Sequence, residues 1–160
     1  MTVPPAVESR PLDTLSRSMQ AFGRLVSQGR IIETVLRRSR IDLSRADVQV
    51  LHTLLAAGDG IRLGDLADRL QLDAPTVTRR VQQLEARHLV RRAADPLDKR
   101  AQLVQLTAAG ARTIERAMSA FHSWLEEVLA DWSGPEREQL VRLLDRFTRD
   151  LNATVECHGD

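Results

Sequence analysis

The stretch DPLDKRAQLVQLT, residues 95–107, joins a charged turn directly to a strand. The turn carries two acids and two bases: Asp95, Asp98, Lys99 and Arg100. Solubility alone does not require this arrangement in a surface turn. Residues 89–93 before the turn and 102–106 after it predict two strands, so the stretch is expected to form a β-hairpin with a long loop.

Two short helices are expected before this hairpin. The first covers residues 64–70 and follows a short extended piece at residues 61–62. The second begins at Asp73, whose side chain can cap it, with Pro75 in the first turn, where a missing N–H costs nothing. Two such helices followed by a hairpin form a winged helix-turn-helix, in which the second helix enters the major groove of DNA.

An earlier helix is expected to support this pair. Ser44 can cap its free amides, Asp47 favours its positive end, and Gly58 ends it. Its predicted buried face consists of Val48, Leu51, Leu54 and Leu55.

The second helix of the pair has an outer face suited to DNA. At about 100° per residue, Val77, Val81 and Leu84 lie together on the core side. The outer side then carries Pro75, Thr76, Arg79, Gln82, Gln83 and Ala86. Arg79 can bind a guanine edge, and Gln83 can bind adenine in the same bidentate way. The alternative is that this is an ordinary solvent-exposed helix face with no role in DNA binding. Such faces usually mix Glu and Lys, and this one does not.

Charge and composition agree with a nucleic-acid partner. The net charge of the 160 residues is +1, but residues 74–106 carry seven bases and three acids, and residues 107–160 carry six bases and ten acids. A basic middle is a possible electrostatic footprint for DNA, with chance clustering of arginines as the alternative. The sequence lacks a long apolar run, and its start lacks the apolar stretch of a signal peptide, so no membrane partner and a cytoplasmic location are expected.

Long helices are expected on both sides of the winged part. Residues 12–38 have one apolar face and a break near residues 27–29. A stripe from Ile114 to Trp132 is followed by a capping box at residues 133–136 and a second stripe from Leu140 to Leu151. These stripes have the 3.5-residue spacing of helices that pack along their length.

Ala117, Trp124 and Leu129 lie off the first of these stripes, which favours a second subunit to cover them. A homodimer is therefore predicted. Its expected interface consists of Leu15, Met19, Leu125, Val128, Trp132, Leu144, Phe147 and Leu151.

Four segments together resemble the MarR (multiple antibiotic resistance regulator) family of transcription factors. These are LSRADVQVL, DLADRL, PTVTRRVQQLEARHLV and DPLDKRAQLVQLTAAG. The resemblance implies a mainly α-helical fold with a small β-hairpin, that is, a winged helix-turn-helix with an α-helical dimerisation domain. The implied divisions are a tail and dimerisation helix at 1–40, the DNA-binding domain at 41–106, and C-terminal dimerisation helices at 107–160.

The resemblance also implies how the charged turn works. Asp98 would hold Arg100 by a salt bridge, and Arg100 would enter the minor groove. Three residues depart from the family pattern: Gln71 and His88 replace glycines, and Arg62 replaces a capping Ser or Thr and would contact phosphate instead. The full set of expected DNA contacts is Pro75, Thr76, Thr78, Arg79, Gln82, Gln83, Asp98, Lys99, Arg100 and Arg62.

Relatives in this family often bind small aromatic or anionic effectors in a cleft between the dimerisation helices and the winged part. In this sequence the cleft would lie among Phe22, Val26, His52, Leu55, Phe121 and Trp124. Core packing explains the same apolar residues equally well. The implied function is a ligand-responsive repressor that binds an inverted-repeat operator in double-stranded DNA as a homodimer, with no cofactor.

Other functions have weaker support. The sequence lacks a motif that pairs a nucleophile or carboxylate with supporting groups, so an enzyme is not expected, and the spacing of its histidines does not favour a metal site. A thiol-based redox regulator acting through Cys157 is one alternative. A winged-helix module that binds protein instead of DNA is another, and Arg79, Gln83 and Arg100 count against it.

Overall fold

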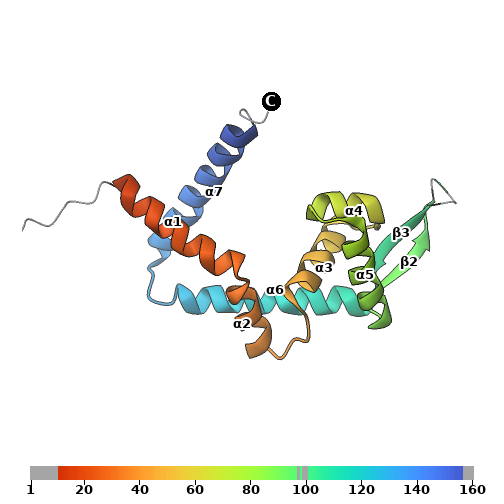
Figure 1. The fold of residues 1–160 in the computed structure, drawn as a ribbon. Helices are drawn as coiled ribbons and strands as arrows, with labels where there is room; N and C mark the ends of the chain where they lie inside the picture. Colours follow the sequence, from red (N-terminus) through yellow and green to blue (C-terminus); the bar gives the residue numbers. More distant parts are fainter. Residues whose placement is uncertain (1–10, 97, 99–100, 157–160) are drawn as a thin grey trace, which may run out of the picture. The chain divides into compact units, whose positions relative to one another are not determined.

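The computed structural model describes residues 11–96, 98 and 101–156. It is mainly α-helical with a small antiparallel sheet, as predicted (Figure 1). The elements in chain order are α1 Pro11–Ser27, α2 Arg30–Arg38, α3 Arg45–Ala57, β1 Ile61–Arg62, α4 Leu63–Leu70, α5 Ala74–Ala86, β2 Val90–Ala94, β3 Gln102–Leu106, α6 Ala108–Val128 and α7 Gly134–Glu156. The chain divides into two compact units, Met1–Phe121 and His122–Asp160.

The core of the first unit lies among α3, α4, α5, the sheet and the first half of α6. Val77, Val81 and Leu84 of α5 are fully buried, as their spacing predicted. On α3 the prediction was partly wrong, because Val50 is buried while Val48 and Leu55 are only half-buried.

The sheet has the strand order β1-β3-β2, and both pairs are antiparallel. β2 and β3 form the predicted hairpin, with Val90 opposite Leu106 and Ala94 opposite Gln102. In Figure 1 this hairpin projects away from α5 and forms the wing. β1 adds to the other edge of β3, so the base of the wing is hydrogen-bonded to the segment that leads into α4.

Three helices of the first unit end in the same way, at a residue in the left-handed region that is not glycine. Arg40, Gln71 and His88 have φ values of 52°, 54° and 57°. In each case two backbone N–H groups fold back onto carbonyls of the last helical turn, as His88 N does to Glu85 O and Leu89 N to Leu84 O. This pattern is a Schellman motif, in which glycine is the usual residue. The sequence departures at Gln71 and His88 are thus tolerated, and Arg40 is a third case that pattern reasoning missed.

The junction between the wing and α6 explains the LTAAG motif that follows the hairpin. Thr107 donates its hydroxyl to His88 O at 2.7 Å and accepts from Gly110 N at 3.0 Å, so it caps α6 while tying it to the end of α5. A Cβ on Gly110 would lie 1.9 Å from Leu89 O, so only glycine allows α6 to pass this close to the backbone just before β2.

The first half of α6 belongs to the core of the first unit. Ile114 is fully buried and Ala117 is 5% exposed, and both lie in the same apolar cluster as α3 and α5. The expectation that Ala117 needs a second subunit to cover it was therefore wrong. Its position off the stripe that ends in Trp132 places it against the winged core instead.

Helices α1 and α7 have a different character. The break between α1 and α2 falls at Gly29, with φ 69°, as predicted. No residue of α1 is buried, and α7 likewise has no buried position among its described side chains. At the start of α7, Glu136 accepts from Ser133 N at 2.8 Å and from its hydroxyl at 2.6 Å, which lowers the pKa of Glu136. Among the described residues, none of the helices combines the length and the apolar character needed to cross a membrane.

Candidate nucleic-acid interface

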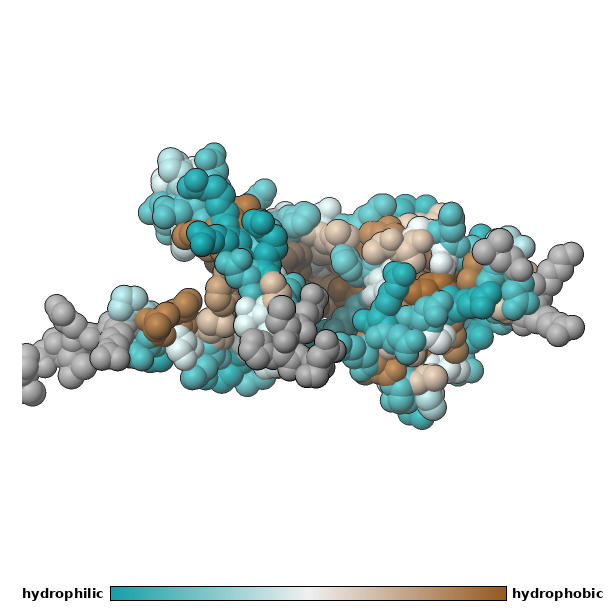
Figure 2. Space-filling view, turned by 90° about the horizontal axis from the view of Figure 1, so that it is seen from above, coloured by the Kyte–Doolittle hydropathy of each residue, from teal (hydrophilic) through white to brown (hydrophobic). Residues whose placement is uncertain are grey.

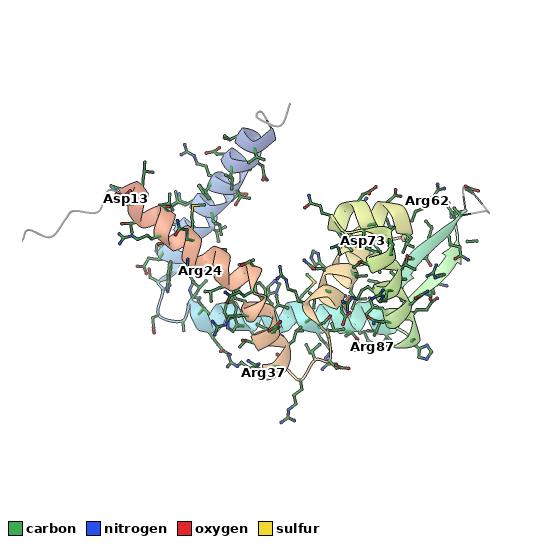
Figure 3. The ribbon with its side chains drawn as sticks, viewed as in Figure 1. Asp13, Arg24, Arg37, Arg62, Asp73 and Arg87 are labelled. Carbon is green, nitrogen blue, oxygen red and sulfur yellow. The ribbon has the colours of Figure 1, made fainter. Side chains whose placement is uncertain are left out.

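The start of α5 is held by one carboxylate. Asp73 has extended backbone, and its Oδ1 accepts from Thr76 N at 2.9 Å, so it caps the helix as predicted. Hydrogen bonds from Thr76 hold the pKa of Asp73 below its ordinary value. Figure 3 shows Asp73 at the turn between α4 and α5. This cap fixes where the outer face of α5 begins.

The outer face of α5 is open to solvent in the described structure. The side chains on it are exposed: Pro75, Thr76, Arg79, Gln82, Gln83 and Ala86. Arg79 forms no hydrogen bond or ion pair with any of the described residues, so its five N–H donors are available. In the space-filling view, hydrophilic side chains cover much of the face around α4, α5 and the wing, with apolar patches between them (Figure 2).

Thr78 differs from the rest of the expected contacts on this helix. Its side chain is half-buried, and its hydroxyl donates to Ala74 O at 2.7 Å, one turn back in α5. The hydroxyl can therefore only accept from a ligand while this bond lasts. Its proposed DNA contact stays a prediction.

Arg62 joins the segment before α4 to the wing. It is the residue that precedes α4, in extended conformation and without a side-chain cap, as its replacement of a Ser or Thr suggested. Its Nε and Nη2 both approach Oδ2 of Asp95, at 2.8 and 2.6 Å, and Nη2 lies 3.9 Å from Asp98 Oδ2. The bond to Asp95 raises the pKa of Arg62. Figure 3 shows Arg62 close to the wing.

Asp95 is only 5% exposed, and sequence reasoning gave it no partner beyond the turn itself. Its backbone N–H donates to Ala101 O at 3.1 Å, closing the loop, while its carboxylate receives Arg62. The first acid of the DPLDKR turn thus anchors the wing to the helix-turn-helix. The sequence contained only one indication of the Arg62–Asp95 ion pair. An arginine replaces the usual capping Ser or Thr, and the acid at the start of the turn had no assigned partner.

Lys99, Arg100 and Cys157 lie outside the described residues. The pairing of Asp98 with Arg100 therefore stays a prediction, as does the redox alternative. Asp98 itself is exposed, and its backbone carbonyl accepts from Ala101 N at 2.8 Å.

Asp47 is the second acid whose role the sequence understated. The predicted cap by Ser44 is present, and Asp47 extends it to a capping box: Asp47 accepts from Ser44 N at 2.9 Å while its own N–H donates to Ser44 Oγ at 3.1 Å. It also receives two arginines from α5 and its end, Arg80 at 3.3 Å and Arg87 at 3.4 Å. The seven-residue spacing of these arginines, which places them on one side of a helix, could have pointed to a shared partner.

The residues of the predicted effector pocket differ in their exposure within the described structure. Phe22 and Val26 are 63% and 43% exposed, His52 is exposed, and Leu55 packs against the core. Trp124 belongs to the second unit, so the pocket as a whole stays a prediction. A shallow depression of about 450 Å³ lies elsewhere, lined by Ser39, Ile41, Arg112, Glu115, Arg116 and Ser119.

Comparisons with known proteins agree with this geometry. Residues 41–101 match the MarR family. The chain is 34% identical over 110 residues to the uncharacterized HTH-type transcriptional regulator YdgJ of Bacillus subtilis, covering 69% of this chain and 66% of that protein. It is 31% identical over 108 residues to YxaD of the same organism, an uncharacterized regulator of the same type, covering 68% and 75%. A mutant of S. aureus MepR bound to an oligodeoxyribonucleotide superimposes with a TM-score of 0.61 at 25% identity, over 86% of this chain and 97% of that one.

A helix-turn-helix with an open polar outer face and a β-wing defines a DNA-binding transcriptional regulator. The chain belongs to the MarR family of such regulators.

Proposed function

We propose that this regulator is a repressor that binds an inverted-repeat operator as a homodimer and releases it in response to a small effector. The observation that carries the DNA part is the outer face of α5, where Arg79, Gln82 and Gln83 are exposed beside small residues. Arg79 would bind guanine and Gln83 adenine through paired hydrogen bonds. Pro75 and Thr76 are small enough to let the helix start approach the groove closely.

The wing would supply a second contact, in the minor groove. Arg100 is the residue proposed to enter it, oriented by Asp98, with Lys99 beside it on the phosphates. Narrow A·T-rich minor grooves attract a guanidinium group. The ion pair of Arg62 with Asp95 supports this role, because it fastens the start of the wing turn to the segment that leads into α4.

The homodimer is supported by the exposed apolar side chains of α1 and of α7, each considered within its own unit. On α1, Leu15 and Met19 are 45% and 41% exposed, and on α7, Leu144 and Leu151 are 56% and 45% exposed. An apolar stripe at helical spacing is stable in water only when another surface covers it. A second copy of the same stripes would do this with two-fold symmetry, which matches an inverted repeat in DNA.

A small aromatic or anionic effector would bind near Phe22, Val26, His52, Leu55, Phe121 and Trp124, by similarity to the family. In this role the chain needs no catalytic residue and no cofactor. A thermal-shift screen of aromatic acids can identify the effector. A compound that binds the folded dimer raises its melting temperature.

The test of the function is a gel-shift assay with the DNA upstream of the protein's own gene. We expect a complex that survives a large excess of unrelated competitor DNA, at a protein concentration at least about 1,000-fold below that needed for unrelated DNA. Equal affinity for both DNAs would contradict sequence-specific regulation and favour a winged-helix module with a protein partner.

A further inference from the structure

Three arginines lie on α5 or directly after it, and they differ in their partners among the described residues. Arg79 is exposed and forms no bond with the described residues. Arg80 and Arg87 are instead bound to the same carboxylate, that of Asp47 at the start of α3. Arg80 Nη1 lies 3.3 Å from Asp47 Oδ1, and Arg87 Nη1 lies 3.4 Å from Oδ2.

The carboxylate that holds them is almost fully buried. Asp47 is 5% exposed and already accepts a hydrogen bond from Ser44 N at 2.9 Å. Arg87 has further partners in the segment before α3, because its Nη2 donates to the backbone carbonyl of Asp42 and lies 3.1 Å from the Asp42 carboxylate. Figure 3 shows Arg87 at the end of α5 that lies farther from the turn.

The geometry constrains α5 as a whole. Residues seven apart lie on the same side of a helix, about 10 Å apart along its axis. One carboxylate that binds both of them resists rotation of α5 about its axis and sliding along it. A rotation of α5 would exchange Arg79 for Arg80 on the outer face, because neighbouring residues differ by about 100°.

The same bonds pair two positive charges that phosphates would otherwise attract, although 33% of the Arg80 side chain and 36% of the Arg87 side chain remain exposed. Non-specific binding to DNA comes from free cations that replace counterions on the phosphates, and each such contact steepens the salt dependence. An arginine that is bound to a buried acid does not contribute to this term without breaking its ion pair. The acid would therefore lower affinity for unrelated sequences while leaving Arg79 available for base contacts.

We propose that Asp47 is a specificity-determining residue of this regulator: it holds Arg80 and Arg87 away from the phosphates and orients α5 so that Arg79 is the arginine that contacts bases. The inference rests on the proposed reading of DNA by α5. Asp47 acts through the arginines and touches no DNA itself, so it is a positioning residue.

The experiment compares Asp47→Asn with the wild type on operator DNA and on unrelated DNA, by fluorescence anisotropy at several salt concentrations. Asparagine can still accept from Ser44 N, so the cap of α3 is retained while the charge is lost. We expect affinity for unrelated DNA to rise several-fold, the salt slope to steepen by about 0.9 per released arginine, and the ratio of specific to unrelated affinity to fall about tenfold.

Asp68→Asn is the matched control, because Asp68 is an exposed acid of α4 that loses the same charge. Asp68→Asn should change the affinity for operator DNA and for unrelated DNA equally and only slightly. The proposal is wrong if Asp47→Asn behaves like Asp68→Asn. It is also wrong if Asp47→Asn weakens binding to both DNAs equally and leaves the salt slope unchanged.

Arg80→Gln gives an independent test that does not require Asp47 to be changed. Because Arg80 is held away from the phosphates, its loss should leave the salt slope on unrelated DNA unchanged. Adding it to Asp47→Asn should remove the part of the steepening that Arg80 causes, about 0.9. A shallower slope for Arg80→Gln alone would show that Arg80 already contacts phosphate and would overturn the proposal. A wild type that shows no preference for its operator would instead sink the proposed function.

Discussion

The winged part and the helices α1 and α7 contain similar apolar residues but bury them very differently. In the winged part, Leu51, Leu66 and Leu84 are completely buried within one chain. On α1 and α7, leucines at equally regular spacing remain exposed, including Leu12 at 75% and Leu143 at 56%. A periodic stripe thus identifies a face that is made to be covered, but it does not say which chain covers it.

The difference also appears in the polar bonds. The winged part is crossed by ion pairs between distant segments, such as Arg62 with Asp95 and Arg87 with Asp47. The ion pairs found on α7 join residues four apart on the same helix, Arg146 with Asp150 and Arg149 with Asp145. Exposed pairs of this kind contribute little to stability. Ion pairs therefore connect distant segments of the winged part, whereas the ion pairs on α7 join residues within that helix.

The largest effect is expected where an uncovered stripe receives charge. Changing both Leu144 and Phe147 to Asp should weaken dimerisation by at least about 100-fold, because an unpaired charge buried at an interface costs about 3–5 kcal/mol. Arg142→Asp introduces the same residue on the opposite side of α7 and should leave the dimer intact. Sedimentation over a range of concentrations measures both. If the wild type is monomeric at micromolar concentration, a second copy of the chain does not cover these apolar stripes.

A truncation in the core should affect folding more than the same truncation on a long helix. Leu84→Ala should lower the free energy of unfolding by about 2–5 kcal/mol, because it leaves a cavity in a closely packed core. Leu12→Ala removes the same atoms from an exposed position of α1 and should change stability by less than about 0.5 kcal/mol. Urea unfolding followed by circular dichroism would reveal the difference, and equal effects would show that α1 is as well packed as the winged core.

A change on the outer face should alter DNA binding without altering stability. Arg79→Ala should cost about 1–3 kcal/mol of binding free energy and relax the choice of one base pair in each half-site. Arg112→Ala, on α6, removes an equal charge and should have little effect on sequence choice. Binding to a panel of single-base operator variants tests this. A uniform loss across the panel would mean that Arg79 contacts only phosphate.

The smallest effect is expected from pH at the start of α5. The pKa of Asp73 is lowered in the folded state from a usual value of 3.8, since Thr76 donates to it. Its stabilising contribution is therefore complete above that usual value and is lost as the pH falls through the lower pKa of the folded state. The difference in stability between wild type and Asp73→Asn should be constant near neutral pH and should shrink only in strong acid. A difference that changes between pH 5 and 7 would point to another group.

Periodicity predicted the parts of the fold that depend on one chain burying its own residues. The buried face of α5, the cap at Asp73 and the break at Gly29 all follow from local rules that the structure satisfies. Ala117 was misassigned because helical spacing gives the direction of a side chain but not the identity of its neighbour. The first half of α6 faces the winged core, which the stripe from Ile114 to Trp132 could not show.

Ion pairs between distant segments were the least predictable feature of the site. Asp47 and its partner Arg87 are 40 residues apart, and Arg62 and Asp95 are 33 apart, so only the folded chain brings them together. The types of residue on the outer face of α5 were predictable from the wheel, whereas the bonds that hold that face in place were not. Arg100, the residue that the DPLDKR turn most strongly indicated, lies outside the described residues and still depends on experiment.

The central claim, that two copies of α5 read DNA as a symmetric pair, is tested most directly by selecting bound sequences from a random DNA library. We expect an enriched inverted repeat whose half-sites are centred about 10 bp apart, one turn of the double helix. We also expect Arg79→Ala to lose preference at one symmetric pair of positions. Enrichment of a single half-site, of a direct repeat, or of no sequence at all would contradict it.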